Sequence, residues 1–191
     1  MDRPPTELST EGDLVREARR GEEQAFLALY YRHRSAVFQF AWRLTGSRSA
    51  AEDITQECFL ALVCGGAAFD SARASLRTYL FGIARNLAMR YFRISEREAE
   101  ETGDSPAPLD VLGDIIAAER SSLVAEAVAQ LPILQREAII LFTFEEVSLE
   151  EIAKIAGVDV GVIKARLHRA RESLRKALAR LLTSDCEGRW S

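Results

Sequence analysis

Basic side chains crowd the segment from Val160 to Leu182, which holds seven lysines and arginines against a single acid, Glu172. A helix that is merely solvated usually mixes its charges, whereas an unmixed cationic helix suits the phosphates of a nucleic acid. Ile163, Leu167 and Ala170 recur at the spacing of one helical face, which leaves the cations on the remaining surface. The pattern predicts an amphipathic helix with a buried stripe and a DNA-binding face.

The residues before this helix predict a second, shorter helix and a tight turn. Ser148 and Glu151 have the spacing of a capping box, which starts a helix. Gly157 can take a positive φ where the chain must reverse, and Asp159 is a suitable N-cap for the next helix. The first helix would bury Ile152, Ala153, Ile155 and Ala156. A basic helix alone could be a solvated face or a site for an acidic partner, but this combination favours a helix-turn-helix that enters a DNA major groove.

A second basic segment lies earlier in the chain. Between Ser71 and Ser95 there are five arginines and no acid. Aromatic rings beside cations can stack on unpaired bases, each contributing on the order of 1–3 kcal/mol. The aromatic residues interleaved with these arginines are Tyr79, Phe81, Tyr91 and Phe92. The core-facing positions are expected to be Leu76, Leu80, Ile83 and Leu87. We therefore assign most of the rings to packing, and the arginines, Asn86 and the loop at residues 70–75 to nucleic-acid contact.

An acidic helix is predicted just before that basic segment. In the run AAEDITQECFLAL, one helical face holds Ile54, Cys58, Ala61 and Leu62. The opposite face holds Glu52, Asp53, Gln56 and Glu57. Acids on a free face are often only solvated. Here the same module carries one acidic and one basic surface, which suits a protein held by two partners at once.

The fold expected for these 191 residues is all-α, with two small helical domains on a tether, the second of them the helix-turn-helix. The net charge of −4 conceals a run from Glu96 to Glu119 with eight acids against the single Arg97. This run contains Gly103, Pro106 and Pro108, so it predicts a flexible acidic linker. The expected order is a disordered N-terminus at 1–12, a first domain at 13–94, the linker at 95–118, a second domain at 119–182 and a tail at 183–191. Helix breaks are expected near Gly46, at residues 65–66, at Pro132, between Val147 and Ser148, and at Gly157.

Several classes of protein are disfavoured by what the chain lacks. The first residues do not form a cationic stretch followed by an apolar one, as in a signal peptide, and no run of eighteen apolar residues occurs. We therefore expect a cytoplasmic protein. Cys58, Cys64 and Cys186 show no metal-ligand spacing, and we expect Cys58 and Cys64 to be buried thiols. Neither a nucleophile elbow nor a phosphate-cradling glycine loop is present. We expect no catalytic activity, no cofactor and no metal.

Four segments in this order resemble one known family. They are AEDITQECFLAL, FDSARASLRTYLFGIARNLA, LPILQREAIIL and SLEEIAKIAGVDVGVIKARLHRARESL. Together they are similar to the alternative bacterial sigma factors of the extracytoplasmic function group, which keep only conserved regions 2 and 4. The resemblance covers about residues 22–182. It implies a factor without catalytic activity that directs RNA polymerase core to specific promoters, region 2 melting the minus-ten element and region 4 reading the minus-thirty-five element.

The resemblance also implies roles for particular residues. Those that would dock on the clamp of the polymerase β′ subunit are Asp53, Gln56 and Glu57. Those that would capture and open the minus-ten element are Phe69, Asp70, Arg73, Ser75, Arg77, Tyr79, Arg85, Asn86 and Arg90. Those that would read the minus-thirty-five element are Val162, Lys164, Ala165, Arg166, Arg169 and Arg171. The segment 134–144 would contact the β-flap, and an anti-sigma protein would hold the free factor inactive.

The chain departs from the usual pattern of that family at four of these positions. Tryptophan is common at Tyr79 and an acid at Arg90, so the minus-ten surface is more cationic here and its binding more sensitive to salt. Threonine and serine are common at Val162 and Ala165, where apolar contact with a thymine methyl becomes more favourable. The promoter sequence therefore cannot be copied from relatives.

One alternative remains open at this point. The chain could be a conventional helix-turn-helix regulator with an N-terminal dimerisation or sensing domain, which binds duplex DNA without docking on polymerase core. Such a protein would need a two-fold site and no affinity for single strands. The acid-free segment from Ser71 to Ser95 argues against it.

Overall fold

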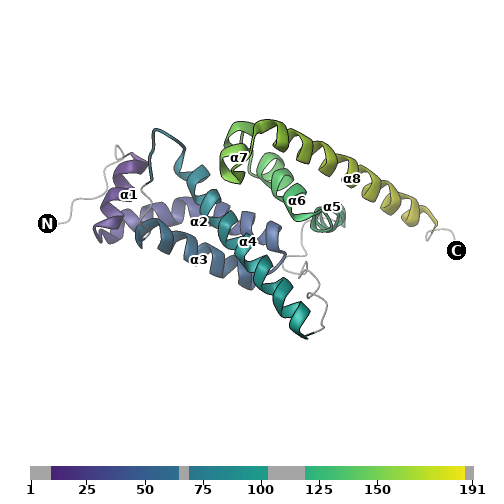
Figure 1. Cartoon of the computed structure of the whole chain (residues 1–191), viewed down its shortest axis with the longest axis horizontal. Helices are drawn as coiled ribbons and strands as arrows, with labels where there is room; N and C mark the ends of the chain where they lie inside the picture. Colours follow the sequence, from purple (N-terminus) through teal and green to yellow (C-terminus); the bar gives the residue numbers. More distant parts are fainter. Residues whose placement is uncertain (1–9, 65–68, 103–118, 188–191) are drawn as a thin grey trace. The chain divides into compact units, whose positions relative to one another are not determined.

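The computed structural model describes residues 10–64, 69–102 and 119–187, with residues 99–102, 119–123 and 180–187 described by their backbone alone. Within these ranges the chain is all-α and contains no strand, as the sequence predicts (Figure 1). It divides into two compact units, Met1–Ala41 with Ser49–Pro106, and Trp42–Arg48 with Ala107–Ser191. The predicted two-domain, all-helical fold is confirmed.

Four helices build most of the first unit. They are α1 (Glu11–Arg19), α2 (Glu23–Thr45), α3 (Arg48–Cys64) and α4 (Leu76–Thr102). Aromatic contacts join three of them. The rings of Phe40 in α2 and Phe81 in α4 have centroids 5.2 Å apart, and Phe59 of α3 lies 5.0 Å from Tyr30 of α2. Because such large side chains bury much apolar area, these contacts hold the helices that carry the charged surfaces.

Helix α1 is fastened to the helices beside it by polar contacts. Its Arg19 donates from Nε to the carbonyl of Leu62 near the end of α3, at 2.9 Å. Its Glu11 meets the buried His33 of α2, with Oε1 and Nε2 also 2.9 Å apart. The chain leaves α1 through Gly21, whose φ of +93° favours glycine. The sequence analysis missed this break between α1 and α2.

Three helices extend beyond the bounds expected for the domains. Glu11 and Gly12, expected in a disordered terminus, already belong to α1, because Thr10 and Asp13 form a capping box. Helix α4 runs through the first part of the predicted linker to Thr102, since residues 95–102 are rich in helix formers and the first glycine is Gly103. Helix α8 likewise enters the predicted tail, as far as residue 187. The rest of the linker, residues 103–118, lies outside the described residues, as do 1–9 and 188–191.

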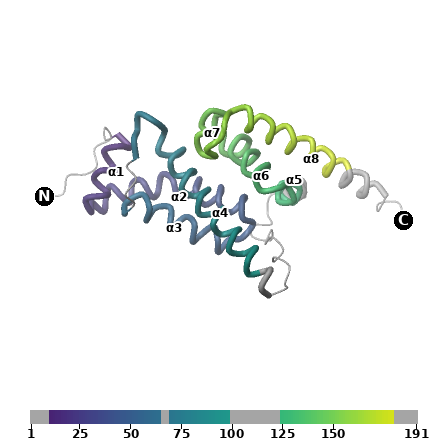
Figure 2. The backbone as a smooth tube through the Cα atoms, viewed as in Figure 1, coloured from purple at the N-terminus to yellow at the C-terminus, as the bar shows by residue number. Residues whose placement is uncertain are grey.

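The second unit is assembled around one long helix, α8 (Val160–Glu187). The helices α5 (Glu119–Ala129), α6 (Ile133–Ile139) and α7 (Leu149–Ala156) each pack against it. Figure 2 traces this part of the backbone in green and yellow. The buried core residues from these elements include Ala138, Ile139, Leu141, Ile152, Ile163, Leu167 and Ala170. The stripe predicted on α8 is therefore its buried face.

Helix α6 does not end where a simple helix would. It continues as a π-helical turn, η1 (Ile140–Phe144), and is followed by Glu146 with a φ of +52°. A π-turn inserts an extra residue into a helix and often marks a functional site. It was not predicted, because the apolar run IILFTF has no feature that distinguishes it from an ordinary α-helix.

The predicted start and end of the shorter helix are confirmed. The hydroxyl of Ser148 accepts from the backbone N–H of Glu151 at 3.3 Å, and the Glu151 carboxylate accepts from the backbone N–H of Ser148 at 3.3 Å. Gly157 ends α7 in the left-handed conformation, with φ 65° and ψ 37°. Ile152, Ala153 and Ile155 are buried, whereas Ala156, expected on the same face, is only partly so.

We predict that Ser148→Ala destabilises the second unit by about 1 kcal/mol, because it removes the N-cap of α7. Urea unfolding followed by circular dichroism measures the loss. The matched control is Ser173→Ala, at an exposed position inside α8, which should be neutral or slightly stabilising because alanine favours a helix interior. Equal effects of the two substitutions would contradict the capping role.

Candidate nucleic-acid and polymerase interfaces

The outer face of α8 presents most of the side chains predicted to read duplex DNA. Lys164, Arg169 and Arg171 are exposed, and Val162 keeps 41% of its surface accessible. Ala165 is half-buried. The guanidinium of Arg171 lies 5.3 Å from the ring centroid of Phe142, a cation–π contact that restricts its position. The helix thus offers three cations and two small apolar side chains, which suits phosphate contact combined with contact to base edges.

Arg166 does not share that exposure. Its side chain is only 15% accessible, and it lies 3.8 Å from a carboxylate oxygen of Glu137, a buried residue of α6. The sequence grouped Arg166 with its neighbours because charge alone cannot show which cations turn inward. Arg180, another cation of the basic run, has its side chain outside the described residues.

The structure adds one residue to this face. His168 is exposed on α8, one turn beyond Lys164, so it shares the surface of the other predicted contacts. The pKa of Glu172 is lowered by its hydrogen bond and ion pair with Lys176 at 3.1 Å and, to a smaller extent, by the neighbouring His168 and Arg175. The acid in the basic run is thus partly neutralised by its own helix. The sequence analysis missed His168 because it counted only lysines and arginines in the basic run.

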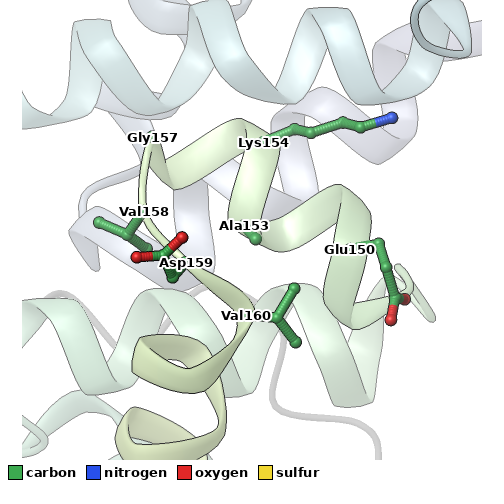
Figure 3. A pocket seen from close by; sticks show the side chains of 7 residues that line it. All are labelled: Glu150, Ala153, Lys154, Gly157, Val158, Asp159 and Val160. Carbon is green, nitrogen blue, oxygen red and sulfur yellow. The ribbon is translucent and has the colours of Figure 1, made fainter.

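A hollow of about 510 Å³ opens at the turn between α7 and α8 (Figure 3). Its lining is Glu150, Ala153, Lys154, Gly157, Val158, Asp159 and Val160. Every lining residue lies in α7, in the turn or at the first position of α8. None of the residues of α8 predicted to contact DNA therefore lines the hollow.

The acidic face of α3 has the expected orientation. Asp53, Gln56 and Glu57 are all exposed, while Ile54, Cys58 and Leu62 are buried and Ala61 is partly buried. The same exposed face also contains Leu60, which is 51% accessible and lies one turn beyond Gln56. An apolar side chain ringed by polar ones is typical of the centre of a protein interface. The sequence analysis assigned Leu60 to neither face of this helix.

The acidic and basic surfaces of the first unit are not separate. Arg90 of α4 donates to Glu57 of α3 at 3.3 Å, and both side chains are about half exposed. This pair offsets part of the charge that Arg90 was expected to add to the minus-ten surface. It joins a residue predicted to bind polymerase to one predicted to bind DNA.

The loop before α4 has a defined shape. The Asp70 carboxylate accepts from the backbone N–H of Ala72 at 2.9 Å. The Ser75 hydroxyl accepts from the backbone N–H of Thr78 at 3.1 Å, which satisfies a donor in the first turn of α4. The ring of Phe69 lies 5.5 Å from that of Tyr79. Asp70 and Ser75, predicted to touch DNA, therefore also fix the loop that would do so.

The basic side of α4 mixes exposed and half-buried side chains. Arg73 of the loop and Asn86 are exposed, whereas Arg77, Tyr79 and Arg85 are half-buried. The core of this helix is formed by Leu76, Leu80, Phe81, Ala84 and Ala88, all fully buried. Ile83 and Leu87, expected in the core, are only partly buried, because the stripe passes through the two alanines instead. The assignment of Phe81 to packing is confirmed.

The two described cysteines differ. Cys58 is fully buried and donates its thiol to the carbonyl of Leu80 at 3.4 Å, whereas Cys64, expected to be buried, is exposed at the end of α3. Burial raises the pKa of the Cys58 thiol to about 12.

Within the described ranges, no three His, Cys, Asp or Glu side chains form a group that could hold a metal ion. None of the described helices combines the length and the apolar character needed to cross a bilayer.

Comparison with known proteins agrees with this geometry. Residues 29–98 match the family described as Sigma-70 region 2, and residues 121–174 match Sigma-70, region 4. The chain is 30% identical over 180 residues to the ECF RNA polymerase sigma factor SigW of Bacillus subtilis, which covers 86% of the chain and 94% of that protein. The chain belongs to the extracytoplasmic function group of the sigma-70 family. It is thus an alternative sigma factor, which directs RNA polymerase to promoters, and the conventional regulator is not favoured.

Two further relatives support the family. The ECF sigma factor SigL of Mycobacterium tuberculosis is 34% identical over 162 residues, which cover 81% of this chain and 89% of that protein. The sigma factor RpoE of Bartonella quintana, solved in complex with the anti-sigma factor NepR, has a TM-score of 0.72 and 28% identity, covering 81% of this chain and 96% of that one. Sigma factors are transcription initiation factors and not enzymes.

We predict that Cys58 of the native sigma factor resists alkylation at pH 8 while Cys64 reacts, because only the thiolate is nucleophilic. Mass spectrometry after iodoacetamide treatment of a Cys186→Ser variant measures both sites, with the denatured protein as control. Equal labelling of the native protein would contradict the burial of Cys58.

The raised pKa also predicts how the free energy of unfolding depends on pH. The unfolded thiol ionises near about pH 8.5, so the contribution of Cys58 is fully present below that pH and is lost as the pH rises towards 12. Urea unfolding at several pH values measures this decline. A Cys58→Ala variant should lack the part of the decline that comes from Cys58. The prediction would be contradicted if the free energy of unfolding of both proteins depended on pH in the same way.

Proposed function

We propose that the two units divide promoter recognition between them. The first unit binds RNA polymerase core through α3 and captures opened DNA through α4 and its preceding loop. The second binds the upstream duplex through α8. The observation that carries this proposal is the distribution of charge: acids are exposed on α3, whereas the exposed faces of α4 up to Arg93 and of α8 are mainly cationic.

Docking on polymerase would use the exposed face of α3. Asp53, Gln56 and Glu57 offer charge and hydrogen bonding, and Leu60 adds apolar area that an interface would cover. Polar groups at the edge of an interface mainly steer association, whereas a desolvated apolar centre contributes most of the affinity. We therefore add Leu60 to the three residues proposed to bind the β′ clamp.

Capture of the minus-ten element would use the loop at residues 69–75 and the start of α4. Arg73, Arg77, Arg85 and Arg90 supply positive charge for the strand, and Asn86 can hydrogen-bond a base edge. Tyr79 is half-buried beside Phe69, and a tyrosine ring at this position could stack on an unpaired base. Melting costs pairing and stacking energy, which capture of the flipped bases would offset.

Reading of the minus-thirty-five element would use Val162, Lys164, Ala165, His168, Arg169 and Arg171. Phosphate contacts from the cations would position the helix, and contacts with base edges would select the sequence. The exposed Leu134 and Phe144, at 39% and 41% accessible, are apolar side chains suited to the β-flap. By analogy with the RpoE–NepR complex, we also propose an anti-sigma partner in the cytoplasm.

Asp53→Asn and Leu60→Ala should each weaken binding to core polymerase by about tenfold, because interface anchors commonly contribute more than 1 kcal/mol. Fluorescence anisotropy with the labelled full chain measures the affinity. The matched control is Glu52→Gln, which changes an exposed acid about a quarter-turn from Asp53 on α3. It should have little effect on the affinity for core polymerase. Equal losses in all three variants would contradict the proposed docking face.

Arg169→Ala should weaken binding of the holoenzyme to promoter DNA while leaving core binding intact. Loss of one phosphate contact lowers the slope of log affinity against log salt by about one. Titrations at several salt concentrations measure this slope. The division of labour would be contradicted if Arg169→Ala and Asp53→Asn impaired both activities equally.

A further inference from the structure

Two oppositely charged side chains of the second unit are withdrawn from solvent together. Glu137 of α6 is 1% accessible and Arg166 of α8 is 15% accessible, with Oε2 and a terminal guanidinium nitrogen 3.8 Å apart. Taking two charges out of water is costly, and an apolar pair of similar volume often packs at lower cost. Because the chain keeps both charges despite this cost, we expect the pair to do more than stabilise the second unit.

The position of Arg166 on its helix is informative. Residues three and four apart on a helix share a side. Val162 and Arg169, both exposed, are therefore its neighbours on α8, one before it and one after it. The ion pair lies at the boundary between the buried stripe and this part of the DNA-reading face.

We propose that Arg166 is a positioning residue, which sets the rotation of α8 about its axis by pairing with Glu137, and does not itself contact DNA. The inference rests on the proposed function, in which α8 reads the promoter. Its consequence is that a side chain of α6, buried and out of reach of DNA, determines which bases the sigma factor prefers.

Apolar packing sets this rotation only approximately. The stripe of Ile163, Leu167 and Ala170 is fully buried, but apolar contacts have no direction. The two charged atoms are buried and lie 3.8 Å apart, without a hydrogen bond between them. A rotation of α8 that moved Arg166 away from Glu137 would weaken the attraction between two charges withdrawn from water, which is costly.

The partner of Arg166 stands on a helix that is itself held in place. Arg136, the residue before Glu137, donates to the carbonyls of Ala129 and Leu131 at the end of α5, the second at 3.2 Å. Arg136 is half-buried, and burial lowers the pKa of its guanidinium. The α5–α6 junction thus provides a fixed support, and the ion pair transmits its position to α8.

The test compares Glu137→Gln, Arg166→Met and the double variant in complex with core polymerase. Binding to a library with a randomised upstream element gives the base preference, and titration at several salt concentrations gives the salt slope. The matched control is Arg169→Met, an exposed arginine one turn further along α8.

A positioning role predicts that Glu137→Gln alone changes the preferred bases and lowers affinity for the original promoter by about tenfold. Arg166→Met should have the same effect, and the double variant should lose no more than either single variant, since both break one interaction. The salt slope should stay unchanged in all three. Arg169→Met should lower it by about one.

The inference is overturned if Arg166→Met lowers the salt slope by about one while Glu137→Gln binds the library as the original protein does. Glu137→Gln decides the matter if Arg166→Met fails to fold, because glutamine keeps the volume and residue 137 cannot reach DNA. If Arg169→Met also has no effect on slope, affinity or preference, the proposed function falls, and the positioning role with it.

Discussion

Burial of one apolar stripe on each helix is the constraint on which both binding faces depend. In α3 the buried Ile54, Cys58 and Leu62 leave the acids on the outside, and in α8 the buried Ile163 and Leu167 do the same for the cations. The burial that stabilises each unit therefore also determines which charges face a partner. A net charge of −4 is compatible with DNA binding because opposite charges occupy different helices.

Two of the ion pairs that join described helices, Glu57–Arg90 and Glu137–Arg166, differ in how easily they can be broken. Glu57 and Arg90 are about half exposed, and such surface pairs contribute only about 0–1 kcal/mol. In the proposed function, Glu57 would therefore exchange Arg90 for a group on polymerase, which would release Arg90 for DNA. Glu137 and Arg166 are buried, and breaking a pair of that kind costs about 3–5 kcal/mol. The first pair suits exchange between partners, and the second suits permanent alignment.

Periodicity and capping were sufficient to predict the fold and the helix-turn-helix. Ser148 and Gly157 bound α7 as expected, because a capping box and a left-handed C-cap are local properties of the sequence. Features set by contacts between helices could not be found in the same way. The inward turn of Arg166 depends on Glu137, distant in the sequence, and the exposure of Cys64 and Leu60 depends on which neighbouring helices reach them. The roles of individual residues remain predictions, since they depend on partners.

The most direct measurement is photocrosslinking in a holoenzyme–promoter complex, with a photoreactive amino acid in place of Arg169 in one variant and of Arg77 in another. A division of labour between the units predicts that position 169 crosslinks to duplex DNA upstream and position 77 to the opened strand near the start site. Crosslinks from both positions to the same stretch of DNA, or from neither to DNA, would contradict the account.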